Sequence, residues 1–291
     1  MYGIYKRAAE ASAPTSLIGK NGSVTMQVLS IQDLSCMGKC SLTVALPILS
    51  AMGISTSVLP TAILSTHTGF PEPVVQPMTE NLLPFAQHIA SVGGSFDAIS
   101  TGYLSDPRQA EAVGKVLDQF NCLKVIDPVM GDHGKLYARI TPEHVDAMKE
   151  LCRRGDYLLP NLTEAAFLTG MPYRERCDGT YLIEMADALC GFGARGVIIT
   201  GISWEPGYTG WAGMQSGRLF SYRARRLPGS QHGTGDMFAA VTTGALTLEK
   251  PLHLAATLGA KFVEKTIAMT PGSTPFGANF EPILPWLWEQ L

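Results

Sequence analysis

A glycine-rich stretch from Leu227 to Asp236 places a backbone suited to binding an anion next to a carboxylate. It ends in Gly233-Thr234-Gly235-Asp236, and apolar residues at helical spacing follow directly. Glycines allow a tight turn that points successive N–H groups one way, and a helix N-terminus adds partial positive charge there. Such donors stabilise a transferred phosphoryl group, and Asp236 could remove a proton from the attacking hydroxyl. A structural alternative stays open, in which Thr234 caps the helix and Asp236 interacts with its dipole.

Four further polar clusters follow short apolar strands in the sequence. Ligands of open α/β sheets bind beyond the carboxyl ends of the strands, so these clusters are expected on one rim with the glycine-rich stretch. The clusters are Thr101-Gly102-Tyr103, Asp127-Pro128-Val129-Met130-Gly131-Asp132, Pro160-Asn161-Leu162-Thr163-Glu164 and Thr200-Gly201.

Two of these clusters carry oxygen ligands suited to a metal–phosphate site. Asp127 and Asp132 could hold Mg²⁺ beside substrate phosphates, although a strand-end turn explains them as well. Asn161 and Glu164 have the spacing of a helix capping box, and they also fit the edge of a metal site. One residue can serve both purposes.

The remaining candidates concern an organic substrate. His67 and Thr68 lie in a polar loop that could reach a bound ring, although loop histidines are commonly solvated. Tyr103 could pack on a flat ligand or belong to the core. Asp33, just after the first predicted strand, could accept a hydrogen bond from a polar substrate or cap the next helix.

Composition excludes several classes of protein. The chain has 291 residues, 46% hydrophobic and 16% charged, with a net charge of −3, which argues against nucleic-acid binding. It contains no apolar run of the roughly 20 residues needed to span a bilayer, so no membrane partner is expected. Six dispersed cysteines lack a zinc pattern and predict reduced thiols in the cytoplasm. Residues 1–25 are interpreted as a disordered or non-native extension, and residues 26–291 as one domain.

Alternating strands and helices must position these side chains. Strands are predicted at 26–31, 57–64, 98–101, 124–127, 157–159 and 196–200, with a hairpin at 211–226. Helices are predicted at 41–52, 78–92, 107–120, 142–152, 164–169, 182–192, 252–268 and 280–291, besides the one after Gly235. Pro60 places its strand near an edge or a bulge. The alternation predicts a largely parallel sheet with helices on both faces.

Taken in order, these motifs resemble the ribokinase-like superfamily, and most closely its pyridoxal/pyridoxine/pyridoxamine kinases. The similarity extends from about Gln27 to about Gly272. It implies a three-layer αβα sandwich, phosphorylation of the 5′-hydroxymethyl group of a vitamin B6 vitamer by ATP with Mg²⁺, and a homodimer. Whether a monovalent ion such as K⁺ is also required stays open.

The resemblance also implies roles for single residues. Gly233, Thr234 and Gly235 would form the anion hole, and Asp236 would be the catalytic base. Asp127, Asn161 and Glu164 would form the Mg²⁺ and phosphate group, with Tyr137 near the nucleotide and Thr200 beside the phosphates. The pyridine ring would contact Asp33, Thr68 and Tyr103, with His67 in the same loop.

Asp33 departs from the family pattern, in which a serine usually precedes a Gly-x-Val-Gly-Asn run. Here Asp33 is followed by Met37-Gly38-Lys39-Cys40-Ser41. A carboxylate favours a protonated ring nitrogen or an amine, so pyridoxamine or a pyrimidine becomes more credible as the substrate. Two alternatives therefore stay open: a hydroxymethylpyrimidine (phosphate) kinase of thiamine synthesis, and a non-catalytic relative that binds B6 or nucleotides.

Overall fold

A nine-stranded sheet forms the centre of the described part of the protein. The computed structural model describes residues 25–228, 231–270, 272 and 274–291, so the interpretation of residues 1–25 as an extension falls almost wholly outside it. The strand order is β11-β10-β9-β8-β5-β4-β1-β2-β3. The parallel strands are β1 (Gln27–Ser35), β2 (Ser55–Leu64), β4 (Ala98–Thr101), β5 (Leu123–Ile126), β8 (Tyr157–Leu158) and β9 (Gly196–Ile202). Antiparallel strands flank them: β3 (Val75–Pro77) on one side, and β10 (Tyr208–Gln215) with β11 (Arg218–Arg225) on the other.

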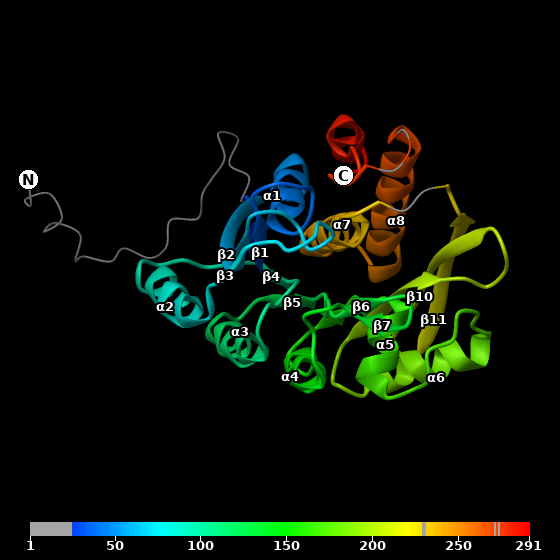
Figure 1. The fold of residues 1–291 in the computed structure, drawn as a ribbon, viewed down its shortest axis with the longest axis horizontal. Helices are drawn as coiled ribbons and strands as arrows, with labels where there is room; N and C mark the ends of the chain where they lie inside the picture. The colour runs from blue at the N-terminus through cyan, green and yellow to red at the C-terminus, as the bar shows by residue number, and fades with distance from the viewer. Residues whose placement is uncertain (1–24, 229–230, 271, 273) are drawn as a thin grey trace, which may run out of the picture.

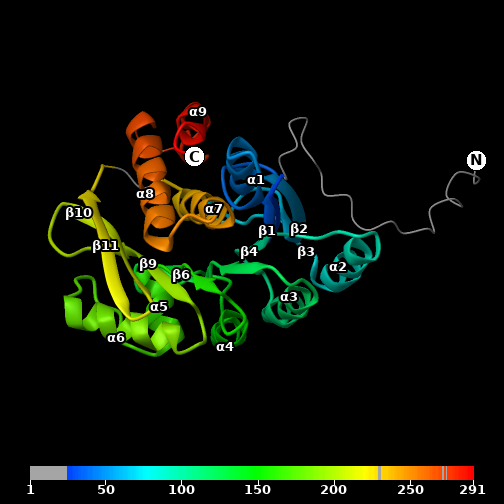
Figure 2. The ribbon, with the colours of Figure 1, turned by 180° about the vertical axis from the view of Figure 1, so that it is seen from behind.

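Helices cover both faces of this sheet (Figures 1 and 2). One face carries α1 (Leu42–Ala51), α7 (Thr234–Thr247), α8 (Leu252–Met269) and α9 (Leu284–Trp288), the last preceded by a 3₁₀ turn, η2 (Glu281–Ile283). The other face carries α2 (Leu82–Ser91), after a 3₁₀ turn η1 (Thr79–Asn81), then α3 (Pro107–Gln119), α4 (Pro142–Cys152), α5 (Leu162–Thr169) and α6 (Gly179–Cys190). The prediction of three layers around a mostly parallel sheet is confirmed.

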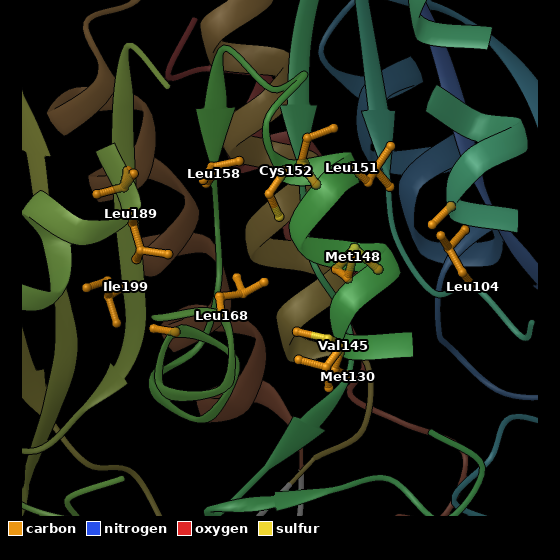
Figure 3. Packing of buried hydrophobic residues seen from close by; sticks show 14 of the residues in the cluster. Leu104, Met130, Val145, Met148, Leu151, Cys152, Leu158, Leu168, Leu189 and Ile199 are labelled. Carbon is orange, nitrogen blue, oxygen red and sulfur yellow. The ribbon is translucent and has the colours of Figure 1, made fainter. Parts of the chain in front are cut away.

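Two apolar cores lie on the two faces because side chains alternate along each strand. In β1, Leu29 and Ile31 pack toward α2–α6, whereas Val28 packs toward α1, α7 and α8. Figure 3 shows the first core, where α4 presents Val145, Met148 and other residues to the sheet. The strand ends are thereby held rigidly, which fixes the loops that follow them.

The structure differs from the sequence prediction mainly at element ends. β1 continues to Ser35, so Asp33 lies inside the strand rather than after it. A register shift between Gln32 and Leu34, opposite Pro60, forms the predicted bulge. Strand β3 and the two-stranded ribbon of β6 (Gly131–Asp132) and β7 (Lys135–Leu136) were not predicted, because segments this short carry little periodicity.

Candidate active site

The N-terminus of α7 presents backbone N–H groups as an anion site requires. Gly233 occupies the N-cap position with φ of +82°, and no side chain caps the helix. Thr234 Oγ1 instead donates to the Gln231 carbonyl oxygen at 3.2 Å. The first-turn N–H groups of a helix have no intrahelical partner. The alternative in which Thr234 acts as the cap is therefore wrong.

The two glycines of this turn, Gly233 and Gly235, have different surroundings. A Cβ at Gly233 would overlap the Lys39 carbonyl oxygen, and the positive φ also favours glycine. Nothing lies within 4 Å of where a Cβ at Gly235 would be, and Gly235 is exposed. Gly233 thus fixes the turn against its neighbour, while Gly235 leaves space above the helix end.

Asp236 lies half-buried in the first turn of α7. Burial raises the pKa of its carboxyl group to about 7, and the nearby Asp33 carboxylate contributes to this rise. The nearby backbone N–H of Ser41 lowers the pKa and partly offsets the effect. A carboxylate with a pKa near neutrality is well matched to accept a proton from a hydroxyl.

Ser41 joins Asp236 to Asp33. Its hydroxyl donates to Asp33 Oδ1, and the Ser35 hydroxyl donates to Asp33 Oδ2 at 3.2 Å. Asp33 is only 4% exposed, and burial raises the pKa of its carboxyl group. Ser41 has φ of 51°, which is uncommon outside glycine. Sequence analysis missed Ser41, which it placed only at the start of the helix predicted at 41–52.

Asn161 and Glu164 form the predicted capping box at the start of α5. Asn161 Oδ1 accepts from the N–H groups of Thr163 (2.8 Å) and Glu164 (3.0 Å), and Glu164 Oε2 accepts from Asn161 N–H at 2.8 Å. Glu164 Oε1 also accepts from Met130 N–H at 3.0 Å. Asn161 Nδ2 donates to the Gly131 carbonyl oxygen at 2.8 Å. The pair therefore holds the loop after β5 against α5.

Within the predicted metal–phosphate group, Asp127 is the residue whose carboxylate is available to bind a ligand. Among the described residues, none donates a hydrogen bond to its side chain. Burial raises its pKa, and the carboxylates of Glu164 and Asp236 add to the shift. Asp132 lies exposed in β6 and pairs with Lys135 across the ribbon. Asp127 thus lies among acidic groups whose mutual repulsion a cation would relieve.

Thr200 and Tyr137, which were predicted to lie near the nucleotide, are adjacent to the segments described above. Thr200 pairs with Asn161 in an isolated parallel bridge, which brings the ends of two neighbouring chain segments together. Tyr137 N–H donates to the Met130 carbonyl oxygen at 2.9 Å. Partial burial raises the pKa of the Tyr137 phenol, and the carboxylates of Glu164 and Asp132 contribute. Tyr137 is nevertheless 42% exposed and so accessible to a ligand.

On the opposite side, Tyr103 lies beside Asp33. Burial raises the pKa of its phenol, and the Asp33 carboxylate adds to the effect. Its backbone carbonyl oxygen accepts from Thr61 Oγ1 at 2.8 Å, which anchors the end of β4 to β2. Thr68 is exposed in the loop after β2.

His67 is buried, and both of its ring nitrogens are engaged with backbone. Nδ1 accepts from Gly69 N–H at 3.0 Å, so Nε2 is the donor to the Pro275 carbonyl oxygen at 2.7 Å. Its ring lies 4.6 Å from that of His232, next to the glycine turn. A Cβ at Gly69 would meet both rings. His67 therefore connects the loop after β2 to the segment that follows α8, and its nitrogens are already committed.

Asp33 and Asp127 thus lie close enough to Asp236 to interact with it electrostatically, and Asn161 and Glu164 hold the loop that follows Asp127. No contact joins the exposed Thr68 to this group among the described residues. The described residues hold no group of three or more His, Cys, Asp or Glu arranged to bind a metal by protein ligands alone. No helix in the described part of the chain is long and apolar enough to cross a membrane.

Comparison with known proteins assigns this site to a family. A sequence model of the phosphomethylpyrimidine kinase family matches residues 49–283. The chain belongs to this family. It is 30% identical over 265 residues to a pyridoxine/pyridoxal/pyridoxamine kinase of Bordetella bronchiseptica, covering 84% of this chain and 89% of that protein.

Solved structures of family relatives share the fold. A Bacteroides thetaiotaomicron protein, described provisionally as a phosphomethylpyrimidine kinase and crystallised with pyridoxal, superposes with a TM-score of 0.86 and 35% identity, covering 90% of this chain and 96% of that one. Pyridoxal kinase of Lactobacillus plantarum gives a TM-score of 0.83 at 32% identity, covering 91% and 97%. The resemblance to ribokinase-like B6 kinases that the motifs indicated is confirmed.

Proposed function

We propose that the protein transfers the γ-phosphoryl group of ATP to the 5′-hydroxymethyl group of a vitamin B6 vitamer. The observation that carries this proposal is the uncapped start of α7, where N–H groups and the Asp236 carboxylate occupy the same turn. Acceptor activation and anion stabilisation are the two tasks of a small-molecule kinase. The family relatives named as B6 kinases support this choice of substrate.

In this proposal Asp236 accepts the proton of the substrate hydroxyl. The hydroxyl oxygen attacks the γ-phosphorus of ATP, and ADP leaves. The backbone N–H groups of Gly233, Thr234 and Gly235 bind the phosphoryl oxygens. Charge that develops on these oxygens is stabilised without reorganisation, because the turn is already formed. The open space above Gly235 admits the phosphate.

Mg²⁺ would accompany the nucleotide and neutralise its phosphate charge. Asp127 suits a direct or water-mediated contact, because its carboxylate has no donor among the described residues. Glu164 suits it less, since backbone N–H groups already occupy both of its oxygens. Mg²⁺ commonly binds through one or two carboxylates together with substrate phosphates. We therefore propose Asp127 as the ligand and Glu164 as the residue that positions its loop, with Asn161, Tyr137 and Thr200 on the nucleotide side.

The substrate ring would lie between Asp33, Tyr103 and Thr68. The buried Asp33 carboxylate accepts two serine hydroxyls and is expected to favour a cationic ring or amine. His67 would shape this pocket through its backbone contacts rather than through a ring nitrogen. A cytoplasmic homodimer remains part of the proposal.

The second candidate is a hydroxymethylpyrimidine kinase, favoured by the family description and by Asp33. A single screen separates the alternatives: ADP release is measured with pyridoxal, pyridoxine, pyridoxamine and hydroxymethylpyrimidine as acceptors. Turnover highest on a B6 vitamer supports the proposal, and turnover highest on the pyrimidine refutes it. Binding of vitamer without ADP release indicates a non-catalytic relative. For Asp33→Ser, we expect the preference for pyridoxamine over pyridoxal to fall; an unchanged ranking contradicts the role of Asp33.

A further inference from the structure

Backbone from two distant segments packs against the glycine turn that precedes α7. The carbonyl oxygen of Lys39, in the loop between β1 and α1, lies where a Cβ of Gly233 would be. A Cβ at Gly277, in the segment after α8, would meet the carbonyl oxygens of both Lys39 and His232. The three segments therefore lie backbone against backbone at the turn.

Hydrogen bonds link the same three segments. The Lys39 N–H donates to the Phe276 carbonyl oxygen at 2.8 Å, and the Ala278 N–H donates to the His232 carbonyl oxygen at 3.4 Å. The segment 274–281 thus bridges the β1–α1 loop and the residue before Gly233. Because no side chain caps α7, the position of its first N–H groups depends on these backbone contacts.

The Lys39 side chain anchors this arrangement. Its ammonium group donates to Asn279 Oδ1 at 2.9 Å and to Glu281 Oε2 at 2.8 Å. The same nitrogen lies 5.7 Å from the centre of the buried Phe280 ring. An ammonium group has three donors, and two of them are used here. The charge of Lys39 is therefore bound by the segment after α8.

We propose that Lys39 is a positioning residue for the anion site: its side chain anchors the β1–α1 loop to the segment after α8, and its carbonyl oxygen holds the Gly233 turn in place. An exposed ion pair adds little stability, and the Glu281 side chain is 52% exposed. The effect is on geometry, since a displacement of about 1 Å near the reacting atoms can cost about 10²-fold in rate. This inference rests on the proposed phosphoryl transfer.

Amide hydrogen exchange tests the anchor without reference to activity. The Met237 N–H donates to the Gly233 carbonyl oxygen at 2.9 Å, so its exchange reports on the turn. We expect Lys39→Met to accelerate exchange at Met237 and at residue 39 by about threefold or more, because both hydrogen bonds open locally once the anchor is lost. Unchanged exchange at Met237 shows that the anchor does not act on the turn and overturns the proposal.

Arg154→Met is the matched control. Arg154 is also a partly exposed cation that joins two elements: it follows α4, and its Nε donates to Asp118 Oδ2 of α3 at 3.3 Å. Its guanidinium group lies against Gly114, in α3. Exchange at Met237 and kcat should both equal those of the wild type. Acceleration at Met237 in this variant too indicates general destabilisation and overturns the specific role of Lys39.

Turnover separates positioning from direct contact with a ligand. In Lys39→Met, kcat should fall about tenfold and KM for ATP should change less than about twofold, because the displaced N–H groups face the phosphoryl group in transfer. Glu281→Ala should lower kcat by about threefold, since the bond from Lys39 to Asn279 remains. The double variant should match Lys39→Met alone, because Glu281 acts only through Lys39.

Two kinetic outcomes overturn the positioning role. A rise in KM for ATP with Lys39→Met and no effect of Glu281→Ala would identify Lys39 as a ligand contact. Losses of kcat that multiply in the double variant would show that the two residues act independently. If the wild type releases no ADP with any acceptor, the proposed function fails, while the exchange rates still decide whether Lys39 holds the turn.

Discussion

Replacing Asp236 by asparagine tests the chemical core of the proposed mechanism. Asparagine has nearly the same shape, and its amide oxygen keeps a hydrogen-bond acceptor near the Ser41 backbone N–H. The turn at Gly233 is unaffected, because its φ and its contact with Lys39 do not involve residue 236. What Asp236→Asn removes is the ability to accept a proton.

The expected loss follows from that single change. A positioned general base contributes about 10²- to 10⁴-fold to a rate, so kcat should fall by that factor, or about 3 to 5 kcal/mol in activation free energy. The pH dependence of kcat/KM provides an independent test. Burial raises the pKa of Asp236 to about 7, so in the wild type the base is lost as pH falls through this region, and kcat/KM should decline there. The residual rate of the asparagine variant should lack this decline.

The assay couples ADP release to a spectrophotometric signal and is paired with calorimetric titration of vitamer and nucleotide. Binding should change by less than about threefold, because the N–H groups that bind the phosphate remain. Asp187→Asn, at an exposed position of α6, provides the control and should match the wild type. A variant at position 236 that keeps more than a tenth of wild-type kcat would refute the assignment of Asp236 as the base.

Three further perturbations address the surroundings of this residue. Gly233→Ala should lower the melting temperature by several degrees through a strained φ and overlap with Lys39, whereas Gly235→Ala should leave it unchanged and raise KM for ATP. His67→Ala should cost about 1 to 3 kcal/mol of unfolding free energy, measured by urea denaturation, because two buried hydrogen bonds are lost. In metal-free buffer, stability should decrease as pH rises from about 4 toward 7, since the raised pKa of Asp236 means that the folded state binds more protons than the unfolded state there. Calorimetry should show a shallower decrease for Asp236→Asn, and an equal slope would contradict the shifted pKa.

The rim of the sheet could be predicted because it depends on chain order. Asp127 and Asn161 each follow a buried parallel strand, and the carboxyl ends of parallel strands lie at the same edge of the sheet. The capping box at Asn161 could likewise be predicted from residue spacing, since its hydrogen bonds join residues that are three positions apart. Local and topological rules were sufficient for these residues.

The role of Ser41 could not be predicted, because its contacts join three separate parts of the chain. Its hydroxyl donates to Asp33 in β1, and its backbone lies close enough to Asp236 in α7 to lower the pKa of that carboxyl group. The same reason applies to His67, whose loop position indicated a solvated ring but whose nitrogens bind Gly69 and Pro275.

Four carboxyl groups lie close together at this rim, and their charged forms are destabilised in the ligand-free protein. Asp33, Asp127, Glu164 and Asp236 all have raised pKa values, because burial opposes their ionisation in the ligand-free protein. For the last three, the charge of a neighbouring carboxylate adds to the effect. Serine hydroxyls hold Asp33 in place and backbone N–H groups hold Glu164, whereas Asp127 has no donor among the described residues. A cation bound at Asp127 would lower the pKa of Asp236 as well, since the two carboxylates interact, whereas the negative phosphates of a nucleotide next to Asp236 would raise it. Asp236 should therefore be a better proton acceptor when the nucleotide binds together with the cation than when it binds without it.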